Sequence, residues 1–426
     1  METHKLQPLN LPLNHNEPRI MHVDLNSCFA TCTQQAFPSL RGKPLVIAAY
    51  TSPNGCVVAP SIEAKQYGIK TGMTVRDARL LYPKVIVRSP DPQLYRDIHI
   101  KFKKIFMDYS PDVTPKSIDE AIIDFTDSHV LFKKGLVEIG YEIKRRMRAE
   151  IGEWISCNIG ISTNRFWAKT AAGLHKPDGL DVITSKNVRD IYEKLSLIDL
   201  CGINVRYQAR LNAYGIFTPI QFLDADLQKL KKQVFRSIVG YYWYLRLRGW
   251  EIDAVDFKRR SYGQSYALGK KTDNPEALAQ LLMKLTEKMG RRLRHAGYTA
   301  RGIHVAIVYT DWTFWHKGKV FDTEMFTTQE LYKKALLVFN KQPERKVVAK
   351  LAVSCFDLSL NKSMQEGLFD NDAVERSRRV SEACDTINDK WGEYVITPAL
   401  MMGMDKLILD RIAFGGVKDL QEIYAM

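Results

Sequence analysis

The sequence predicts an α+β protein built from several domains. The chain has 426 residues, which is too long for one compact core, because a domain usually holds roughly 100–200 residues. Short β-rich runs alternate with helical segments as far as residue 180, short helices fill residues 181–251, and strands return with a long amphipathic helix from residue 262. This order predicts two mixed regions of strands and helices with a helical region between them.

The first mixed region, residues 20–180, begins with a short apolar strand, IMHVDL, that ends on an acid. The segments that follow alternate in type: a β-rich run at 44–50, a helix at 94–109, the strand SIDEAIIDF, a helix at 132–150, the strand SCNIGIS and the helix NRFWAKTAAGLHK. We expect a sheet layered with helices and interrupted early by an inserted subdomain. Residues 1–19 are polar and rich in proline, so they are expected to form a loose extension.

Three further segments complete the chain. Residues 252–261 belong to GWEIDAVDFKRRS, which we interpret as a basic linker. Residues 262–358 contain the amphipathic helix ALAQLLMKLTEKMGRRLRHAG and alternating strands, and they predict a second α/β domain. The tail is residues 359–426, in which residues 370–426 have no functional assignment and a helix is expected at RVSEACDTINDKWG.

Composition favours a polyanionic partner. Lys and Arg number 62 against 48 Asp and Glu, which gives a net charge of +14. No apolar run approaches the roughly 20 residues of a membrane span, and the N-terminal residues lack a signal core, so we expect a cytoplasmic protein with no membrane contact. The seven cysteines show no zinc spacing and are expected to be reduced thiols: Cys28, Cys32, Cys56, Cys157, Cys201, Cys355 and Cys384.

Three carboxylates mark the candidate site. Asp24 ends one apolar strand, and the pair Asp119 and Glu120 lies in another. Asp24 alone would more often be a turn or cap residue, but two such strands side by side would form an all-oxygen site suited to Mg²⁺ or Mn²⁺. Successive side chains of a strand point to opposite faces of the sheet. Asp119 and Glu120 can therefore face the same site only if the chain bends at this point. Pro111 and Pro115 place it just after a loop.

Several segments, taken in order, resemble the Y-family of DNA polymerases, the translesion group that includes bacterial DNA polymerase IV and the catalytic subunit of polymerase V. These segments are HVDLNSCFA, RGKPLVIAA, EAKQYGIKTGM, SIDEAIIDF and GISTNRFWAKTAAGLHKPDG. The resemblance implies a right-hand polymerase with a palm (20–180), inserted fingers (about 32–90), a helical thumb (181–251) and a C-terminal little finger (262–358).

The resemblance also implies roles for individual residues. Asp24, Asp119 and Glu120 would be catalytic metal ligands for two Mg²⁺ ions, which Mn²⁺ could replace, with the Leu25 carbonyl as a further ligand. Asp124, on the same strand as the pair, is better explained as a structural acid at the strand end. The alternative, that Asp24 is a cap, stays open at this point.

In the nucleotide pocket, the resemblance makes Phe29 a steric gate against ribonucleotides, although a core aromatic is the simpler reading of that residue. Lys169 and Lys65 would contact the triphosphate, and a solvated lysine is the alternative for Lys169. The family usually has Tyr and Arg in the finger helix where this chain has Ile62 and Lys65. Lysine keeps the charge without the bidentate fork, and Ile62 is not expected to be a ligand.

Three further segments predict binding partners for the protein. Residues 199–216 resemble a helix–hairpin–helix that holds DNA phosphates near Gly202 and Asn204, although a plain helical turn is the alternative. Residues 252–360 carry 19 Lys and Arg against 11 Asp and Glu, a net charge of +8, which favours DNA binding with a strong salt dependence. QEGLF resembles a sliding-clamp peptide, with Gln365, Leu368 and Phe369 as its contacts. We expect a monomer.

The sequence therefore predicts a template-directed, low-fidelity DNA polymerase that acts in translesion synthesis during DNA repair, with primer–template DNA and dNTP as substrates. A catalytically silent DNA-binding scaffold of a repair complex is the alternative, because of the changes at Ile62 and Lys65. A nucleotidyl cyclase with a similar palm would lack the basic second half of the chain.

Overall fold

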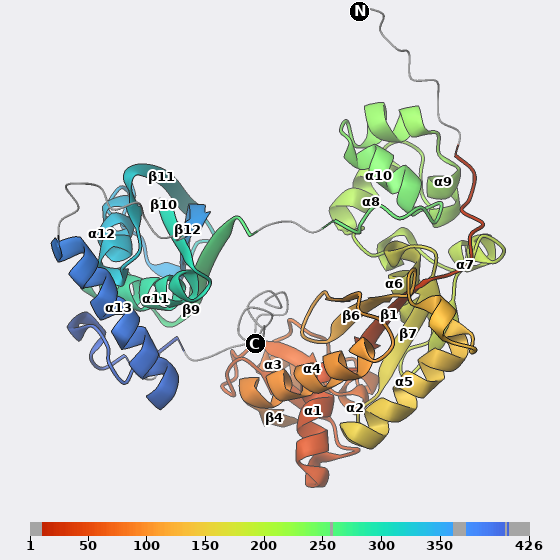
Figure 1. Ribbon diagram of the computed structural model, residues 1–426, viewed down its shortest axis with the longest axis horizontal. Helices are drawn as coiled ribbons and strands as arrows, with labels where there is room; N and C mark the ends of the chain where they lie inside the picture. The colour runs from red at the N-terminus through yellow and green to blue at the C-terminus, as the bar shows by residue number, and fades with distance from the viewer. Residues whose placement is uncertain (1–10, 256–258, 361–371, 405–406, 409–426) are drawn as a thin grey trace, which may run out of the picture. The chain divides into compact units, whose positions relative to one another are not determined.

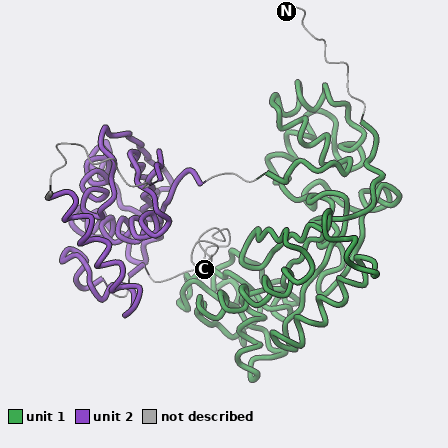
Figure 2. Tube along the Cα trace, viewed as in Figure 1, with its two compact units in different colours: residues 1–256, 411–424, 426 green, residues 257–410, 425 purple. Residues whose placement is uncertain are grey.

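The structure, a computed structural model, describes residues 11–255, 259–360, 372–404 and 407–408. These residues form two compact units, with the division at residue 256 (Figure 2). Each unit has a hydrophobic core of its own. No helix in the described ranges is both long and apolar enough to cross a membrane.

Unit 1 is organised around a five-stranded sheet of order β5-β6-β1-β7-β8, whose three middle strands are labelled in Figure 1. The central strand β1 pairs antiparallel with both β6 and β7, whereas β7 and β8 run parallel. The strands are β1 (Ile20–Leu25), β5 (Val113–Pro115), β6 (Glu120–Asp124), β7 (Cys157–Ser162) and β8 (Leu180–Val182). The two acidic strands expected from the sequence are thus neighbours in one sheet.

Helices cover both faces of this sheet. One face packs, with residues such as Met21, Val23 and Ile123, against α1, α4 and α5. The opposite face lies under α6, and Gly160 makes this close approach possible, since an added Cβ would lie 1.9 Å from the Ala168 carbonyl oxygen. The helices are α1 (Cys28–Ala36), α4 (Pro92–Met107), α5 (Leu136–Glu150) and α6 (Arg165–Leu174), with short 3₁₀ turns at Pro38–Leu40 and His129–Leu131.

A small subdomain is inserted between α1 and α4, as the sequence predicted. Its three-stranded sheet has the order β3-β2-β4, and its core includes Val46, Val57 and Ile69. Its elements are β2 (Leu45–Ala48), β3 (Val57–Pro60), α2 (Ile62–Gln66), α3 (Val75–Leu81) and β4 (Ile86–Arg88). Each helix begins at a capping residue whose hydroxyl accepts a backbone N–H, Ser61 for α2 and Thr74 for α3.

Short helices follow the sheet and share an aromatic core in which Phe222 and Phe235 contact Trp243. The helices are α7 (Val188–Glu193), a 3₁₀ turn (Leu197–Asp199), α8 (Val205–Asn212), α9 (Pro219–Asp224), a π-helix (Lys229–Val234) and α10 (Val239–Arg246). Leu11 and Leu13 pack against the same core. The expectation of a loose extension over residues 1–19 is therefore wrong for residues 11–19.

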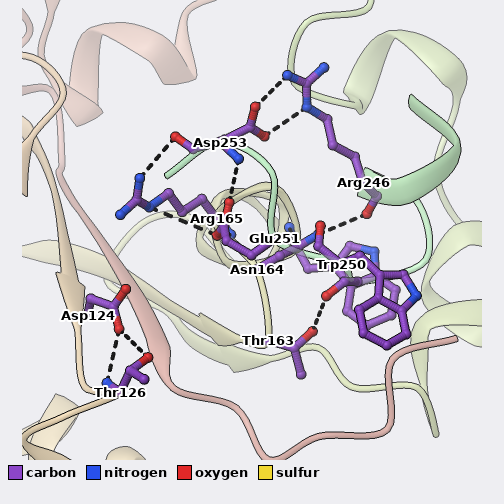
Figure 3. A network of polar contacts seen from close by, with 11 residues as sticks. Asp124, Thr126, Thr163, Asn164, Arg165, Arg246, Trp250, Glu251 and Asp253 are labelled. Carbon is purple, nitrogen blue, oxygen red and sulfur yellow. Dashed lines mark hydrogen bonds and ion pairs between the residues drawn. The ribbon is translucent and has the colours of Figure 1, made fainter. Parts of the chain in front are cut away.

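The start of the expected linker is held firmly within unit 1. Arg246 binds both oxygens of Asp253, and Arg165 at the start of α6 donates to the Asp253 carbonyl at 2.9 Å (Figure 3). Glu251 accepts the Arg165 backbone N–H at 2.8 Å, and Asn164 donates to the carbonyls of Arg246 and Trp250. The acids and backbone carbonyls of this segment, held by Arg165 and Arg246, fix this part of the chain, and the domain boundaries themselves remain a prediction.

Unit 2 is a four-stranded antiparallel sheet of order β11-β10-β12-β9 with α11 and α12 packed on one face. Its elements are β9 (Ser261–Thr272), α11 (Pro275–His295), β10 (Tyr298–Tyr309), β11 (Phe314–Met325), α12 (Thr328–Phe339), β12 (Val348–Leu360), α13 (Asp372–Trp391) and a 3₁₀ turn (Ala399–Met401). The helix expected in the tail is present as α13. It belongs to unit 2, since Asp385 and Asp389 pair with Arg294 and Arg291 of α11.

Candidate active site

A cavity of about 570 Å³ lies in unit 1 at the end of β1. It is bordered by the start of α1, the end of β3, the exposed side of α2 and the loop after α6. Its lining residues are Asp24, Leu25, Asn26, Ser27, Cys28, Phe29, Val58, Ala59, Pro60, Ile62, Lys65, Gln66, Thr71, Asp119, Glu120, Lys176 and Pro177. All three carboxylates singled out from the sequence are among them.

Backbone pairing brings the three acids together. Asp24 is the direct register partner of Glu120, the first residue of β6. Asp119 lies in the bend immediately before that strand, and its carbonyl accepts the Leu25 N–H at 2.9 Å. The bend explains how two successive residues both line the cavity, which strict strand alternation would forbid.

Each acid has a partner of its own. Lys169 Nζ lies 2.7 Å from Glu120 Oε2, Lys176 donates to Asp24, and Ser117 Oγ donates to Asp119 Oδ1 at 2.5 Å. Within the described ranges, no three His, Cys, Asp or Glu side chains converge as a ready-made metal centre. The three carboxylates therefore share one cavity, while each is turned toward its own partner.

Burial disturbs the pKa values of this group. Burial raises the pKa of Asp24, with Lys176 opposing it, and burial likewise raises the pKa of Asp119. Burial is the largest single influence on the pKa of Glu120 and acts to raise it, but the charge and hydrogen bond of Lys169, together with His22 and Lys176, lower that pKa overall. Two of the three acids thus lack enough positive charge nearby to offset their desolvation.

Phe29 is both a core residue and a wall of the cavity. Its ring is 2% exposed and stacks on Tyr95 with ring centroids 4.4 Å apart. The chain turns sharply just before α1, where Ser27 adopts a left-handed conformation with φ 48°. This turn separates Asp24 at the strand end from Phe29 in the first turn of α1, and both side chains reach the cavity.

The finger helix α2 contributes Ile62 and Lys65 to the opposite wall. Burial and the charge of Lys176 lower the pKa of Lys65. Ile62 brings no polar atom to this wall. The two positions at which the sequence departs from the family pattern, Ile62 and Lys65, therefore border the cavity itself.

Lys176 was not predicted from the sequence, although it lies within the motif that contains Lys169. It lines the cavity directly and pairs with Asp24, whereas Lys169 reaches Glu120 from α6 and is not one of the lining residues. The signal was the Lys-Pro-Asp-Gly sequence that follows α6. A lysine in a loop directly after a helix that covers the acidic strands is a second candidate cation.

His22 is a second residue that the sequence reasoning missed. Its side chain is 2% exposed, and its Nε2 lies 3.8 Å from Glu120 Oε2. Burial lowers the pKa of His22 to about 4, so the ring is neutral at physiological pH. Neither ring nitrogen has a hydrogen-bond partner among the residues that the structure describes, an arrangement that usually costs about 1–3 kcal/mol.

Asp124 has the structural role expected for it. Its carboxylate accepts hydrogen bonds from the backbone N–H and the hydroxyl of Thr126, at 3.0 and 2.6 Å (Figure 3). It is not a lining residue of the cavity. Asp124 therefore closes a turn at the end of β6 and provides a control for the three acids.

The turn before α8 contains Gly202 and Asn204, the two residues singled out in the expected hairpin. Gly202 has φ +91°, as a tight turn requires, but Asn204 is extended, with φ −102°. Its side chain caps α8 by accepting the N–H groups of Arg206 and Tyr207 at 3.1 and 3.0 Å. A phosphate at this turn would have to compete with Asn204 for these two donors. The clamp residues Gln365, Leu368 and Phe369 lie outside the described residues.

Two family matches cover most of the chain. The impB/mucB/samB family matches residues 23–173, and the impB/mucB/samB family C-terminal domain matches residues 259–368. Among curated relatives, DNA polymerase IV of Pelotomaculum thermopropionicum is 32% identical over 90% of this chain and 95% of its own length. DNA polymerase IV 1 of Bacillus subtilis is 28% identical over 88% of this chain and 91% of its own length.

Solved structures share the fold. A Y-family DNA polymerase chimera of Dbh and Dpo4 covers 80% of this chain and 99% of its own, with a TM-score of 0.72 and 23% identity. The insertion ternary complex of Dbh DNA polymerase covers the same shares, with a TM-score of 0.57 and 23% identity. These neighbours agree with the fold expected from the sequence, including its C-terminal little-finger domain.

Proposed function

Because the chain belongs to the impB/mucB/samB family and is a DNA-directed DNA polymerase of the Y-family, translesion type, we propose that it extends a primer 3′-hydroxyl with dNTP by a two-metal mechanism, under template direction and with low fidelity. The observation that carries this proposal is a set of three carboxylates that line one cavity with lysines beside them: Asp24 and Glu120 on two paired strands, and Asp119 in the bend before β6. Asp24, the Leu25 carbonyl, Asp119 and Glu120 are the proposed metal ligands.

The donor chemistry of the site fits divalent cations. All proposed ligands are oxygens, which suit Mg²⁺, with Mn²⁺ as a substitute. Burial raises the pKa of Asp24 and of Asp119, so both carboxylates gain from a cation. Bound ions would polarise the primer hydroxyl and neutralise charge on the triphosphate. A bound ion would compete with the lysine that each of Asp24 and Glu120 holds through one of its two carboxylate oxygens.

The remaining lining residues support a nucleotide pocket. We assign Phe29 as the steric gate against a ribose 2′-hydroxyl, because its buried ring is held in place by Tyr95 while it borders the cavity. Lys65 and Lys169 are the proposed triphosphate contacts, and Lys176 joins them because it lines the cavity. A lysine released from its carboxylate by a metal ion is free to bind phosphate.

For the DNA partner, we propose that the basic segment 252–360 and the turn at Gly202 and Asn204 contact primer–template phosphates. Phosphate contacts of this kind carry no sequence information, as a general polymerase requires. We also propose docking on a sliding clamp through Gln365, Leu368 and Phe369, and a cytoplasmic monomer as the working form.

Primer extension on an undamaged template with Mg²⁺ and dNTP tests the catalytic proposal. Wild type should extend the primer, and the double variant Asp119→Ala, Glu120→Ala should not. Asp124→Ala is the matched control, because this acid lies on the same strand outside the cavity. A wild type that binds primer–template without extending it would favour a silent scaffold, and full extension by the double variant would refute the proposed ligands.

A further inference from the structure

His22 lies directly beneath the proposed metal site. It sits two residues before Asp24 on β1, so both side chains point to the same face of the sheet. Its register partners on the flanking strands are Ile122 and Gly160. Helix α6 closes over this face because Gly160 has no side chain, and His22 is left 1% exposed.

Packing alone does not explain a histidine at this position. A leucine would fill an enclosed strand position without burying a polar atom, whereas both nitrogens of His22 lack a hydrogen-bond partner in the described part of the chain. Unpaired buried polar side chains are uncommon in folded proteins, and each calls for an explanation, such as a role at a reactive site or beside a bound ion. The polar group that Nε2 faces is Glu120 Oε2, at 3.8 Å.

That distance is just beyond a hydrogen bond, and Glu120 Oε2 is held at 2.7 Å by Lys169 Nζ. We propose that His22 is a positioning residue: when Glu120 turns from Lys169 to a bound divalent cation, the His22 Nε2–H donates to the Glu120 carboxylate and fixes its orientation. This inference rests on the proposed function, since it requires a cation at Glu120. Residues that hold a metal ligand in this way commonly affect metal affinity as much as activity.

The geometry assigns the role to Nε2 of His22, and this determines which variants test the proposal. A glutamine places its amide nitrogen near the position of Nε2, whereas an asparagine places its own near Nδ1. His22→Gln should therefore preserve the contact, and His22→Asn and His22→Leu should lose it. Ile122→Val is the packing control, because Ile122 is the register partner of His22 on β6 and carries no polar group.

The experiment measures binding of Mn²⁺ to the full-length protein, by electron paramagnetic resonance of the free ion. The sample contains primer–template with a dideoxy 3′ end and the matching dNTP, so that no turnover occurs. His22→Leu and His22→Asn should bind Mn²⁺ about tenfold more weakly than wild type, and His22→Gln and Ile122→Val should stay within about twofold of it. Thermal unfolding should show His22→Leu to be at least as stable as wild type, because a buried unpaired group is removed.

Three outcomes would overturn the inference. Unchanged Mn²⁺ affinity in His22→Leu would show that His22 does not position Glu120. A lower unfolding midpoint in His22→Leu, with equal loss of affinity in His22→Gln, would assign His22 a purely structural role. Wild-type binding no stronger than that of the Asp119→Ala, Glu120→Ala variant would remove the metal site itself, and with it the role of His22, a result distinct from the first.

Discussion

Two clusters of partly buried charge, one in each unit, are organised in opposite ways. The open cluster, in unit 1, consists of Asp24, Asp119 and Glu120 with Lys169 and Lys176. Each of its acids is held by a lysine or a hydroxyl, and each faces the cavity. Burial raises the pKa of two of the three acids, which means that their charges are only partly compensated.

The closed cluster, in unit 2, is centred on Arg294, whose side chain is 4% exposed. Its guanidinium binds both oxygens of Asp385, at 2.6 and 2.9 Å, and also donates to Thr328 Oγ1 and the Phe326 carbonyl. The acceptors come from α12, α13 and the loop before α12, and they satisfy the guanidinium on several sides. This geometry holds α13 on α11 and leaves little capacity for a ligand.

The difference teaches that buried charge by itself does not identify a functional site. Removing one partner of a buried charge whose hydrogen bonds are complete destabilises the fold, because the other partner is left buried and unpaired. A charge that borders a cavity with lone pairs to spare costs stability until a ligand arrives. The two clusters should therefore respond to substitution in opposite ways.

The largest effect is expected for Asp24→Asn in the open cluster. Loss of this proposed ligand should slow primer extension at least about 1,000-fold, or about 4 kcal/mol in the activation free energy. The free energy of unfolding should stay equal or rise, because a carboxyl with a raised pKa destabilises the fold when it ionises at neutral pH. Single-turnover extension and urea titration measure the two quantities, and a substantial loss of stability would show that Asp24 belongs with the closed type.

Arg294→Leu in the closed cluster should show the reverse pattern. It leaves Asp385 without its main partner, and should lower the free energy of unfolding of unit 2 by about 3 kcal/mol. Urea titration followed by circular dichroism measures this loss. The control is Arg379→Leu, which breaks an exposed pair with Glu375 and should leave the transition unchanged. Equal curves for the two variants would contradict the structural role given to Arg294.

A smaller effect separates two buried phenylalanines of the same core. Phe29 is 2% exposed and borders the cavity, while Phe102 is 1% exposed and does not. Both leucine substitutions should cost similar stability, but only Phe29→Leu should raise ribonucleotide incorporation relative to dNTP, by about tenfold. The ratio of kcat/KM for the two nucleotides measures the effect. The same ratio in both variants would remove Phe29 as the gate.

The sequence predicted the open cluster better than the closed one. Asp24 and the pair at 119–120 stand out because acids interrupt apolar strands, and the prolines before the pair correctly suggested a bend. Phe29 and Lys65 were found only through the motifs around them. The two mixed regions and the inserted subdomain also follow from residue patterns, whereas the tail helix was expected over residues 379–392 and lies at 372–391 in the structure.

What the sequence did not predict depends on contacts between distant segments. The positions of Lys176 and His22 in the site depend on the packing of α6 over the face of the sheet at Gly160. No local sequence pattern reveals that packing. Leu11 and Leu13 fall in a polar, proline-rich stretch that indicated a loose extension, yet they pack against a core more than 150 residues further along. The pairing of Arg294 with Asp385 likewise joins the expected domain to a tail helix whose packing no local pattern indicated.

The smallest effect compares two lysines of the inserted subdomain. Lys65 lines the cavity, and Lys70, on the loop after α2, does not. Lys65→Arg adds a planar fork that can bind phosphate in a bidentate manner, and it should lower the KM for dNTP about threefold, the equivalent of roughly 0.6 kcal/mol. Burial and the charge of Lys176 lower the pKa of Lys65. The lysine therefore loses its charge as the pH becomes alkaline, whereas an arginine keeps its charge. The advantage should therefore widen as the pH rises, as steady-state kinetics from neutral to alkaline pH would show. Lys70→Arg should leave KM unchanged at every pH, and a matching fall in that variant would mean that general surface charge, not the cavity wall, determines nucleotide affinity.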